Sequence, residues 1–210
     1  QGRITIQKSL PKTIMTDHYR LIQIFLNLVG NALKFTDSGS IDLNVEWIDR
    51  YQTVNDKCFE PYPYNEDDQD EGLFTKKQMF NFIDPNYFMI NTGSRKPLDL
   101  WKTSQDHNHR GGKRNGILKV TVRDPGCGIP KEQLENIFQK FTQVTNDISK
   151  RKLGTGLGLF ITRQLCQRMK GDIRAYSKEG EGSCFIFCIP AEVVYERTHD
   201  FEILKQKISQ

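Results

Sequence analysis

The most constraining feature of the sequence is the segment Asp124–Ile129, which follows a run with the pattern of a β-strand. In that run, residues 117–123, apolar side chains alternate with more polar ones, as in a strand with one buried face. A carboxylate at the strand end can accept a hydrogen bond from an exocyclic amine such as that of adenine, and such a bond contributes about 1.5–3 kcal/mol. The glycines at 126 and 128 let the backbone approach a flat ring closely. A plain tight turn after a strand fits the same residues.

Four further motifs stand in a fixed order around this segment, namely Asn27–Thr36, Phe138–Phe141, Gly154–Leu159 and Gly180–Ser183. Together the five resemble the N, G1, F, G2 and G3 boxes of the catalytic and ATP-binding domain of histidine kinases. That domain is a member of the GHKL superfamily (gyrase, Hsp90, histidine kinase, MutL). The resemblance covers about residues 1–48 and 116–190. Five boxes in order are far more specific than any one of them.

The resemblance implies that the chain binds ATP with Mg²⁺ and that its catalytic residues are Asn27, Asn31 and Lys34. By resemblance, Asn31 coordinates the metal, Asn27 supports the geometry of metal and phosphates, and Lys34 reaches a phosphate oxygen. Their spacing of four and three residues places them side by side on one helix face. Mg²⁺ takes hard oxygen ligands and keeps several waters, so an amide oxygen plus the phosphates suffices. The other interpretation is a solvated helix face with two incidental asparagines.

The glycines of residues 154–158 precede a helix, where exposed backbone N–H groups and the helix dipole attract an anion. The polar segment before them, residues 142–153, matches the position of the ATP lid, and Lys150, Arg151 or Lys152 can meet the triphosphate. Phe138 and Phe141 are expected to pack beside the nucleotide, although ordinary core packing explains them equally well. The residues expected to contact ATP are Asn31, Lys34, Asp124, Gly126, Gly128, Ile129, Phe138, Phe141, Lys152, Gly154, Thr155, Gly156, Leu157 and Gly158.

The order of the predicted elements favours an α+β fold. Apolar spacing predicts a helix from Asp17 to about Phe35, capped by Thr16 or Asp17, and a short helix from Glu132 to Phe138. A further helix is expected after Gly158. Strands are expected at residues 3–10, 41–47 and 117–123, and in a hairpin over residues 173–189. Because the strands come in neighbouring runs, we expect a two-layer α/β sandwich whose mixed sheet is covered on one face by helices. This matches the Bergerat fold of the resembled superfamily.

The predicted domain spans residues 1–190 and is interrupted by a long insertion at about residues 49–115. The regular pattern dissolves there, and the segment contains an acidic cluster at residues 66–71 and a basic end at residues 110–114. The resembled family usually joins the two strands on either side of this insertion, expected here at residues 41–47 and 117–123, by a much shorter connection. Most of the insertion is expected to be flexible, and its aromatic residues indicate that part of it folds back onto the domain. Residues 191–210 are expected to form a tail or linker.

Composition narrows the possible partners and compartment. A net charge of +4, evenly spread, does not favour nucleic acid as a binding partner. No apolar run approaches the roughly 20 residues of a membrane span, and no signal peptide is present, so no membrane contact is expected here. Five cysteines without a C-x-x-C pair fit reduced thiols and a cytoplasmic location. The start at Gln1 indicates a piece of a longer protein, which itself can be membrane-anchored.

The resemblance implies transfer of the ATP γ-phosphate to a histidine, and then to an aspartate on a response-regulator receiver domain, in two-component phosphorelay signalling. His18 lacks the His-Glu-x-x-x-Pro setting of the family's acceptor, so it is interpreted as a surface residue. The acceptor and its dimerisation domain are expected before Gln1. ATPases of the superfamily have a glutamate as general base where Asn27 stands, which favours a kinase with slow hydrolysis. The alternatives are a GHKL-type ATPase and a degenerate nucleotide-binding or scaffold module, and Pro125 and the long insertion keep the second of these open.

Overall fold

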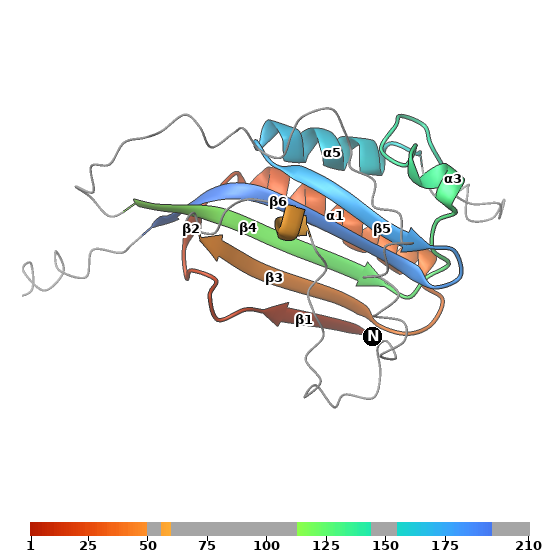
Figure 1. The fold of residues 1–210 in the computed structure, drawn as a ribbon, viewed down its shortest axis with the longest axis horizontal. Coiled ribbons are helices and arrows are strands. Elements are labelled where there is room, and N and C mark those ends of the chain that lie inside the picture. The colour runs from red at the N-terminus through yellow and green to blue at the C-terminus, as the bar shows by residue number, and fades with distance from the viewer. Residues whose placement is uncertain (50–55, 60–112, 144–154, 195–210) are drawn as a thin grey trace, which may run out of the picture.

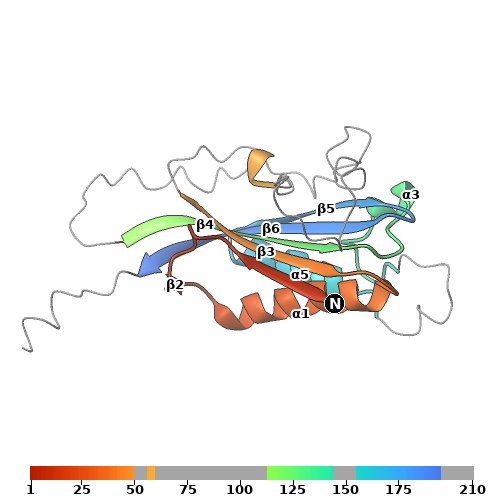
Figure 2. The same cartoon turned by 90° about the horizontal axis from the view of Figure 1, so that it is seen from below.

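The computed structural model describes residues 1–49, 56–59, 113–143 and 155–194. Within these ranges the chain forms a six-stranded mixed sheet. Two helices, α1 and α5, lie side by side on one of its faces (Figures 1 and 2). The predicted α+β sandwich, with helices covering one face of a mixed sheet, is therefore confirmed.

The sheet has the order β1-β3-β4-β6-β2, with β5 also paired to β6. The strands are β1 (Gly2–Ile6), β2 (Ile14–Met15), β3 (Ile41–Asp49), β4 (Lys113–Asp124), β5 (Asp172–Lys178) and β6 (Gly182–Val194). Only β1 and β3 pair in parallel among the described strands, and the remaining pairs are antiparallel. The sheet continues through Pro190 to Val194, so it extends four residues into the segment predicted as a tail.

Helix α1, His18–Phe35, is the predicted helix and begins one residue later than expected. Asp17 is its N-cap, and its Oδ1 accepts a hydrogen bond from the Arg20 N–H at 3.1 Å, which satisfies one of the free donors of the first turn. Ile24, Leu28 and Ala32 are buried one helical turn apart and face the sheet. The buried stripe fixes the rotation of α1, and with it the direction in which its polar face points.

The other helices are α3, Lys131–Leu134, and α5, Gly158–Arg168. The prediction that α3 reaches Phe138 was wrong. Beyond Leu134 the backbone hydrogen bonds join residues only three apart, from the N–H of Asn136 to Gln133 O and from that of Gln139 to Asn136 O, so the chain continues as turns. None of the helices in the described ranges combines the length and apolar character needed to cross a bilayer.

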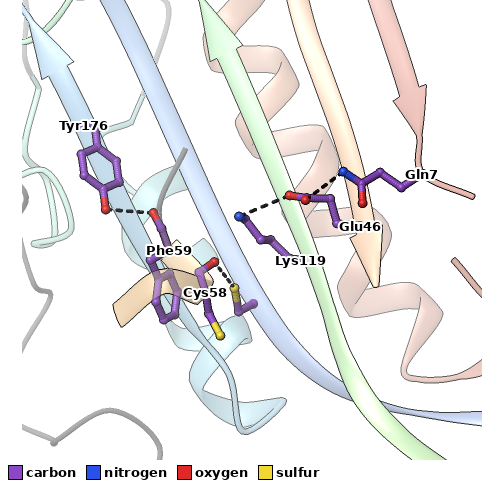
Figure 3. Close-up of polar contacts among 7 residues, drawn as sticks. Gln7, Glu46, Cys58, Phe59, Lys119 and Tyr176 are labelled. Carbon is purple, nitrogen blue, oxygen red and sulfur yellow. Dashed lines mark hydrogen bonds and ion pairs between the residues drawn. The ribbon is translucent and has the colours of Figure 1, made fainter. Parts of the chain in front are cut away.

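The main core lies between the sheet and the helices, where Leu118, Val120 and Val122 of β4 meet α1. The alternate residues of β4 point to the opposite face, which carries a buried ion pair. There, Lys119 Nζ lies 3.3 Å from Glu46 Oε2, and Gln7 Nε2 donates to Glu46 Oε1 at 3.0 Å (Figure 3). These contacts connect Gln7, the residue after β1, to β3 and β4.

The opposite face also carries η1, a short 3₁₀ helix at Asp56–Phe59. Cys58 and Phe59 are buried there in a second apolar cluster that includes Cys184 and Cys188 of β6. Part of the predicted insertion therefore does pack on the sheet, and the two strand cysteines are core residues. At its two ends the insertion is shorter than predicted, because residue 49 belongs to β3 and residues 113–115 belong to β4. Residues 50–55 and 60–112 lie outside the described ranges.

We predict that capping by Asp17 measurably stabilises the fold. Asp17→Ala should lower the free energy of unfolding by about 1–2 kcal/mol, because it removes the capping oxygen and the ion pair to Arg20, whose Nε lies 3.0 Å from Asp17 Oδ2. Asp17→Asn is the matched control. It keeps a capping oxygen and loses only an exposed ion pair, so its loss should stay below about 0.5 kcal/mol. Urea denaturation measures both, and equal losses would show that the cap contributes nothing.

Candidate functional site

A cavity of about 350 Å³ lies among α1, the N-terminus of α5, the turn after β4 and the β5–β6 hairpin. Its volume is in the range of small-molecule sites. Polar groups from separate elements converge on it, and apolar side chains form the rest of its wall. Its lining residues are Leu26, Asn27, Gly30, Asn31, Lys34, Phe35, Asp124, Cys127, Gly128, Ile129, Ile137, Thr142, Gln143, Thr155, Gly156, Gly158, Leu159, Ser183 and Phe185.

The polar face of α1 supplies one side of the cavity. Asn27, Asn31 and Lys34 all line it, as their spacing predicts for neighbours on one helix face. Lys34 Nζ lies 4.7 Å from the centroid of the Phe35 ring, and desolvation lowers the pKa of Lys34 from its usual value. This side of the cavity therefore combines two amides with a positive charge, a set suited to phosphate oxygens.

Asp124 lies at the end of β4, and only 4% of its surface is exposed. Its Oδ1 accepts a hydrogen bond from the N–H of Gly126 at 3.0 Å. Burial raises the pKa of Asp124 to about 6, and the Gly126 hydrogen bond offsets this only in part. In the described ranges no lysine or arginine forms an ion pair with Asp124, so its charge is poorly compensated and is disposed to meet a donor in the cavity.

The turn after Asp124 is fixed by backbone contacts on both sides. Cys127 N–H donates to Phe35 O at the end of α1 at 3.3 Å, and Gly180 N–H donates to Cys127 O at 2.7 Å. A Cβ on Gly126 would lie 2.4 Å from Phe35 O, and one on Gly128, whose φ is +66°, would lie 1.9 Å from Lys178 O. Both positions therefore require glycine. This close approach brings Asp124 and the α1 amides to one cavity.

The N-terminus of α5 and the residues before it form another part of the wall, with Thr155, Gly156 and Gly158 lining the cavity. In the described structure no side chain caps α5 at Leu157, so the N–H groups of its first turn are open to an anion. A Cβ on Gly158 would lie 3.6 Å from Asn27 Oδ1, so this N-terminus closely approaches the amide face of α1.

The structure brings nine of the predicted site residues to the cavity, namely Asn27, Asn31, Lys34, Asp124, Gly128, Ile129, Thr155, Gly156 and Gly158. Gly126 acts through its hydrogen bond to Asp124, and Leu157 lies at the N-cap of α5; neither lines the cavity. Lys152 and Gly154 fall outside the described residues, as do Lys150 and Arg151.

The two predicted phenylalanines lie away from the cavity wall. Phe138 is buried in the main core, and Phe141 is 73% exposed with a φ of +62°. Ile137 lines the cavity in their place. Core packing, the alternative left open for these aromatics, describes Phe138.

Sequence reasoning missed several lining residues, among them Phe35, Cys127, Ser183 and Phe185. Ser183 and Phe185 had a readable signal, because they alternate along β6 on the face that bears the core. Phe35 and Cys127 lie inside the motifs Asn27–Thr36 and Asp124–Ile129, but their place on the cavity wall depends on the tertiary contact between the end of α1 and the turn.

The donor set also fits a magnesium ion. The oxygens of Asn27 and Asn31 stand one helical turn apart on the cavity wall. Within the described ranges no group of three or more His, Cys, Asp and Glu residues could hold a metal by itself. Mg²⁺ needs no such cage, because it keeps water ligands and shares the oxygens of a bound phosphate. Asn31, with Asn27 beside it, is thus the part of this chain that suits the ion.

Comparison with known proteins gives a consistent result. Residues 101–193 match the family described as histidine kinase-, DNA gyrase B-, and HSP90-like ATPase. The chain is 31% identical over 184 residues to probable histidine kinase 5 of Oryza sativa subsp. japonica, covering 88% of the chain and 15% of that protein. It is 30% identical over 186 residues to the signal transduction histidine-protein kinase BarA of Escherichia coli K12, covering 89% of the chain and 14% of that protein. The chain thus spans about a seventh of these relatives.

A solved structure has the same fold. The crystal structure of full-length ShkA in complex with AMPPNP aligns with a TM-score of 0.53 at 22% sequence identity. The alignment covers 93% of this chain and 26% of that one. The similarity supports the architecture of sheet and helices described above.

We predict that Asp124→Asn stabilises the fold at high pH. The pKa of Asp124 is raised to about 6 from its ordinary 3.8, so the folded state binds this proton more tightly than the unfolded state. Stability from this group is full below about pH 4, falls as pH rises, and is lost above about pH 6. The neutral isostere should raise the free energy of unfolding at pH 8 by up to about 3 kcal/mol, roughly two pKa units, and by little at pH 4. Urea denaturation at both pH values tests this, and an equal effect at both would contradict it.

Proposed function

The chain carries a catalytic and ATP-binding domain of the histidine-kinase type, and from this premise we propose that it binds ATP·Mg²⁺ and presents the γ-phosphate to a histidine. The observation that carries the proposal is that Asp124, Asn31 and Lys34, from separate parts of the sequence, line one cavity. A carboxylate that suits a purine amine and a polar face that suits phosphates, both lining one cavity, match the two ends of a nucleotide.

In the proposed binding mode, Asp124 accepts a hydrogen bond from the adenine amine, with Ile129 and Phe185 beside the ring. Lys34 and the N–H groups at the start of α5 meet the phosphates. Asn31, supported by Asn27, holds Mg²⁺, which when bound neutralises phosphate charge during transfer. The basic residues at 150–152 belong to the proposed lid. The proposed domain is residues 1–190 with the insertion at about 49–115, and β6 carries its sheet on to Val194.

Histidine is the proposed acceptor because the site has no general base for water at Asn27. An amide cannot take a proton from water, so hydrolysis by the domain alone should be slow. The acceptor is proposed to lie on a dimerisation domain N-terminal to this chain in the parent protein, with a receiver domain as the next acceptor in a cytoplasmic phosphorelay. The two relatives named above are histidine kinases by name, which supports histidine as the acceptor.

The discriminating experiment is phosphotransfer from radiolabelled ATP to a separately supplied histidine-bearing dimerisation domain. Label on the histidine supports the kinase. Binding of ATP without transfer favours the alternative, a degenerate nucleotide-binding or scaffold module. Fast release of inorganic phosphate by this chain alone favours a GHKL-type ATPase instead.

We predict that two substitutions separate adenine recognition from phosphate chemistry. Asp124→Asn should reduce affinity for both ATP and adenosine by about tenfold or more, because a charge-assisted hydrogen bond contributes roughly 1.5–3 kcal/mol. Asn31→Ala should leave adenosine binding within about twofold of wild type but reduce phosphotransfer at least about a hundredfold, the scale of a lost electrostatic stabiliser. Calorimetry and the transfer assay measure the two effects. A matching loss of adenosine affinity in both variants would contradict the assignment.

A second prediction concerns pH. Adenosine carries no phosphate, so its affinity isolates the adenine contact. Because the amine needs an ionised acceptor and the pKa of Asp124 is about 6, adenosine affinity should be constant above pH 7. Below pH 6 it should fall by up to about tenfold per pH unit. Titration calorimetry from pH 5 to pH 8 tests this, with Asp124→Asn as the control whose affinity should not vary. An affinity independent of pH in the wild type would rule out the carboxylate as acceptor.

A further inference from the structure

The sheet face opposite α1 and α5 has an occupant of its own, the η1 turn (Figure 2). Phe59 is 1% exposed and Cys58 is 4% exposed, although both belong to a short turn outside the sheet. They pack against residues of β4, β5 and β6 that point away from the nucleotide cavity. These are Ile117, Tyr176, Cys184, Ile186 and Cys188.

Directional contacts fix η1 in this position. Tyr176 OH donates to Phe59 O at 2.8 Å, and Cys188 Sγ donates to Cys58 O at 3.4 Å (Figure 3). The Arg174 guanidinium carbon lies 4.1 Å from the centroid of the Phe59 ring, and Arg174 is almost completely buried. The β5–β6 hairpin thus contacts two consecutive carbonyls and the aromatic ring of η1, so η1 has a specific binding position on the sheet.

The same hairpin forms part of the nucleotide cavity. On β6, Ser183 and Phe185 line the cavity, and Cys184 between them points into the η1 cluster. On β5, Tyr176 binds Phe59, and the next residue, Ser177, accepts a hydrogen bond from Ile129 N–H at 2.8 Å. Because successive strand residues point to opposite faces, two residues of the η1 cluster, Tyr176 and Cys184, are each one peptide away from a group that shapes the site.

We propose that η1 is a positioning element for the nucleotide site, with Phe59 as its anchor, so that docking of η1 and binding of nucleotide strengthen each other. This inference rests on the proposed function, because it concerns the same cavity. Docking holds the β5–β6 hairpin, the hairpin holds the turn at Ile129, and the turn presents Asp124. Coupling between two sites is reciprocal in free energy, so nucleotide must retain η1 as strongly as η1 favours nucleotide.

The wild-type chain permits a direct test, because its own cysteines report on docking. Cys58 of η1 and Cys188 of β6 are buried together in the η1 cluster, whereas Cys166 is buried in the main core. Thiol labelling followed site by site with mass spectrometry should modify Cys58 faster than Cys166, since undocking is local. A non-hydrolysable ATP analogue should reduce the labelling rate of Cys58 by about fivefold or more, the lower end of typical coupling free energies. A Cys58 rate that nucleotide leaves unchanged, or that equals the Cys166 rate throughout, overturns the proposal.

A pair of variants tests the other direction. Phe59→Ala should raise the Kd for ATP by about fivefold or more, and Phe59→Leu, which keeps apolar volume, should recover part of the loss. Val193→Ala is the matched control. Val193 is buried at the far end of β6, in a different cluster from η1, so its truncation weakens the same strand without touching either site. It should leave the Kd within about twofold of wild type even where its loss of stability matches that of Phe59→Ala.

The outcomes separate this inference from the function on which it rests. A wild-type chain that binds no ATP overturns both. A wild-type chain that binds ATP, with a Kd unchanged in Phe59→Ala, overturns only the coupling and leaves η1 as packing. Equal increases of Kd in Phe59→Ala and Val193→Ala also overturn it, because general weakening of β6 then accounts for the effect.

Discussion

The site depends on a buried carboxylate that the fold holds in place without a counter-charge. Asp124 receives one hydrogen bond, from the N–H of Gly126, and in the described structure no cationic side chain pairs with it. Its raised pKa reflects the free-energy cost of burying its negative charge. In the proposed binding mode a ligand amine supplies the missing donor, so binding relieves a free-energy cost that folding incurs. Under that proposal, Asp124 at this position serves recognition and is opposed by stability.

The turn that carries Asp124 also decides how the separate parts of the chain meet. Its backbone lies between Phe35 O at the end of α1 and the residues of the β5–β6 turn, at distances that exclude a Cβ. Hydrogen bonds on both sides leave the turn little freedom to shift. The amide face of α1 and the carboxylate at the end of β4, about 90 residues apart in sequence, are thereby brought to one cavity. Preorganisation of this kind reduces what a ligand must order on binding.

Sequence was sufficient where structure is decided locally. The Asp17 cap, helix α1, the alternation of β4 and the hairpin of β5 and β6 follow from short-range patterns, and each was predicted. It was insufficient where tertiary contacts decide, as in the early end of α3 and the place of Phe138 and Phe141. The boundary at Pro190 shows the same limit. Pro190 lies between the parts of β6 that pair with β5 and β2, where one edge of the strand lacks a partner in the described sheet, so the missing N–H is tolerated.

The η1 turn was beyond prediction for the same reason, and its position has a wider consequence. A four-residue turn inside a segment without periodicity has no local signal in the sequence, and only its tertiary contacts with the sheet determine it. A sheet is one residue thick, so its two faces cannot be altered independently. Tyr176 and Ser177 share a peptide, yet one binds Phe59 and the other holds Ile129 at the cavity. A segment that settles on the open face of this fold therefore acts on the nucleotide site through the strands, without any change in the residues that touch the ligand.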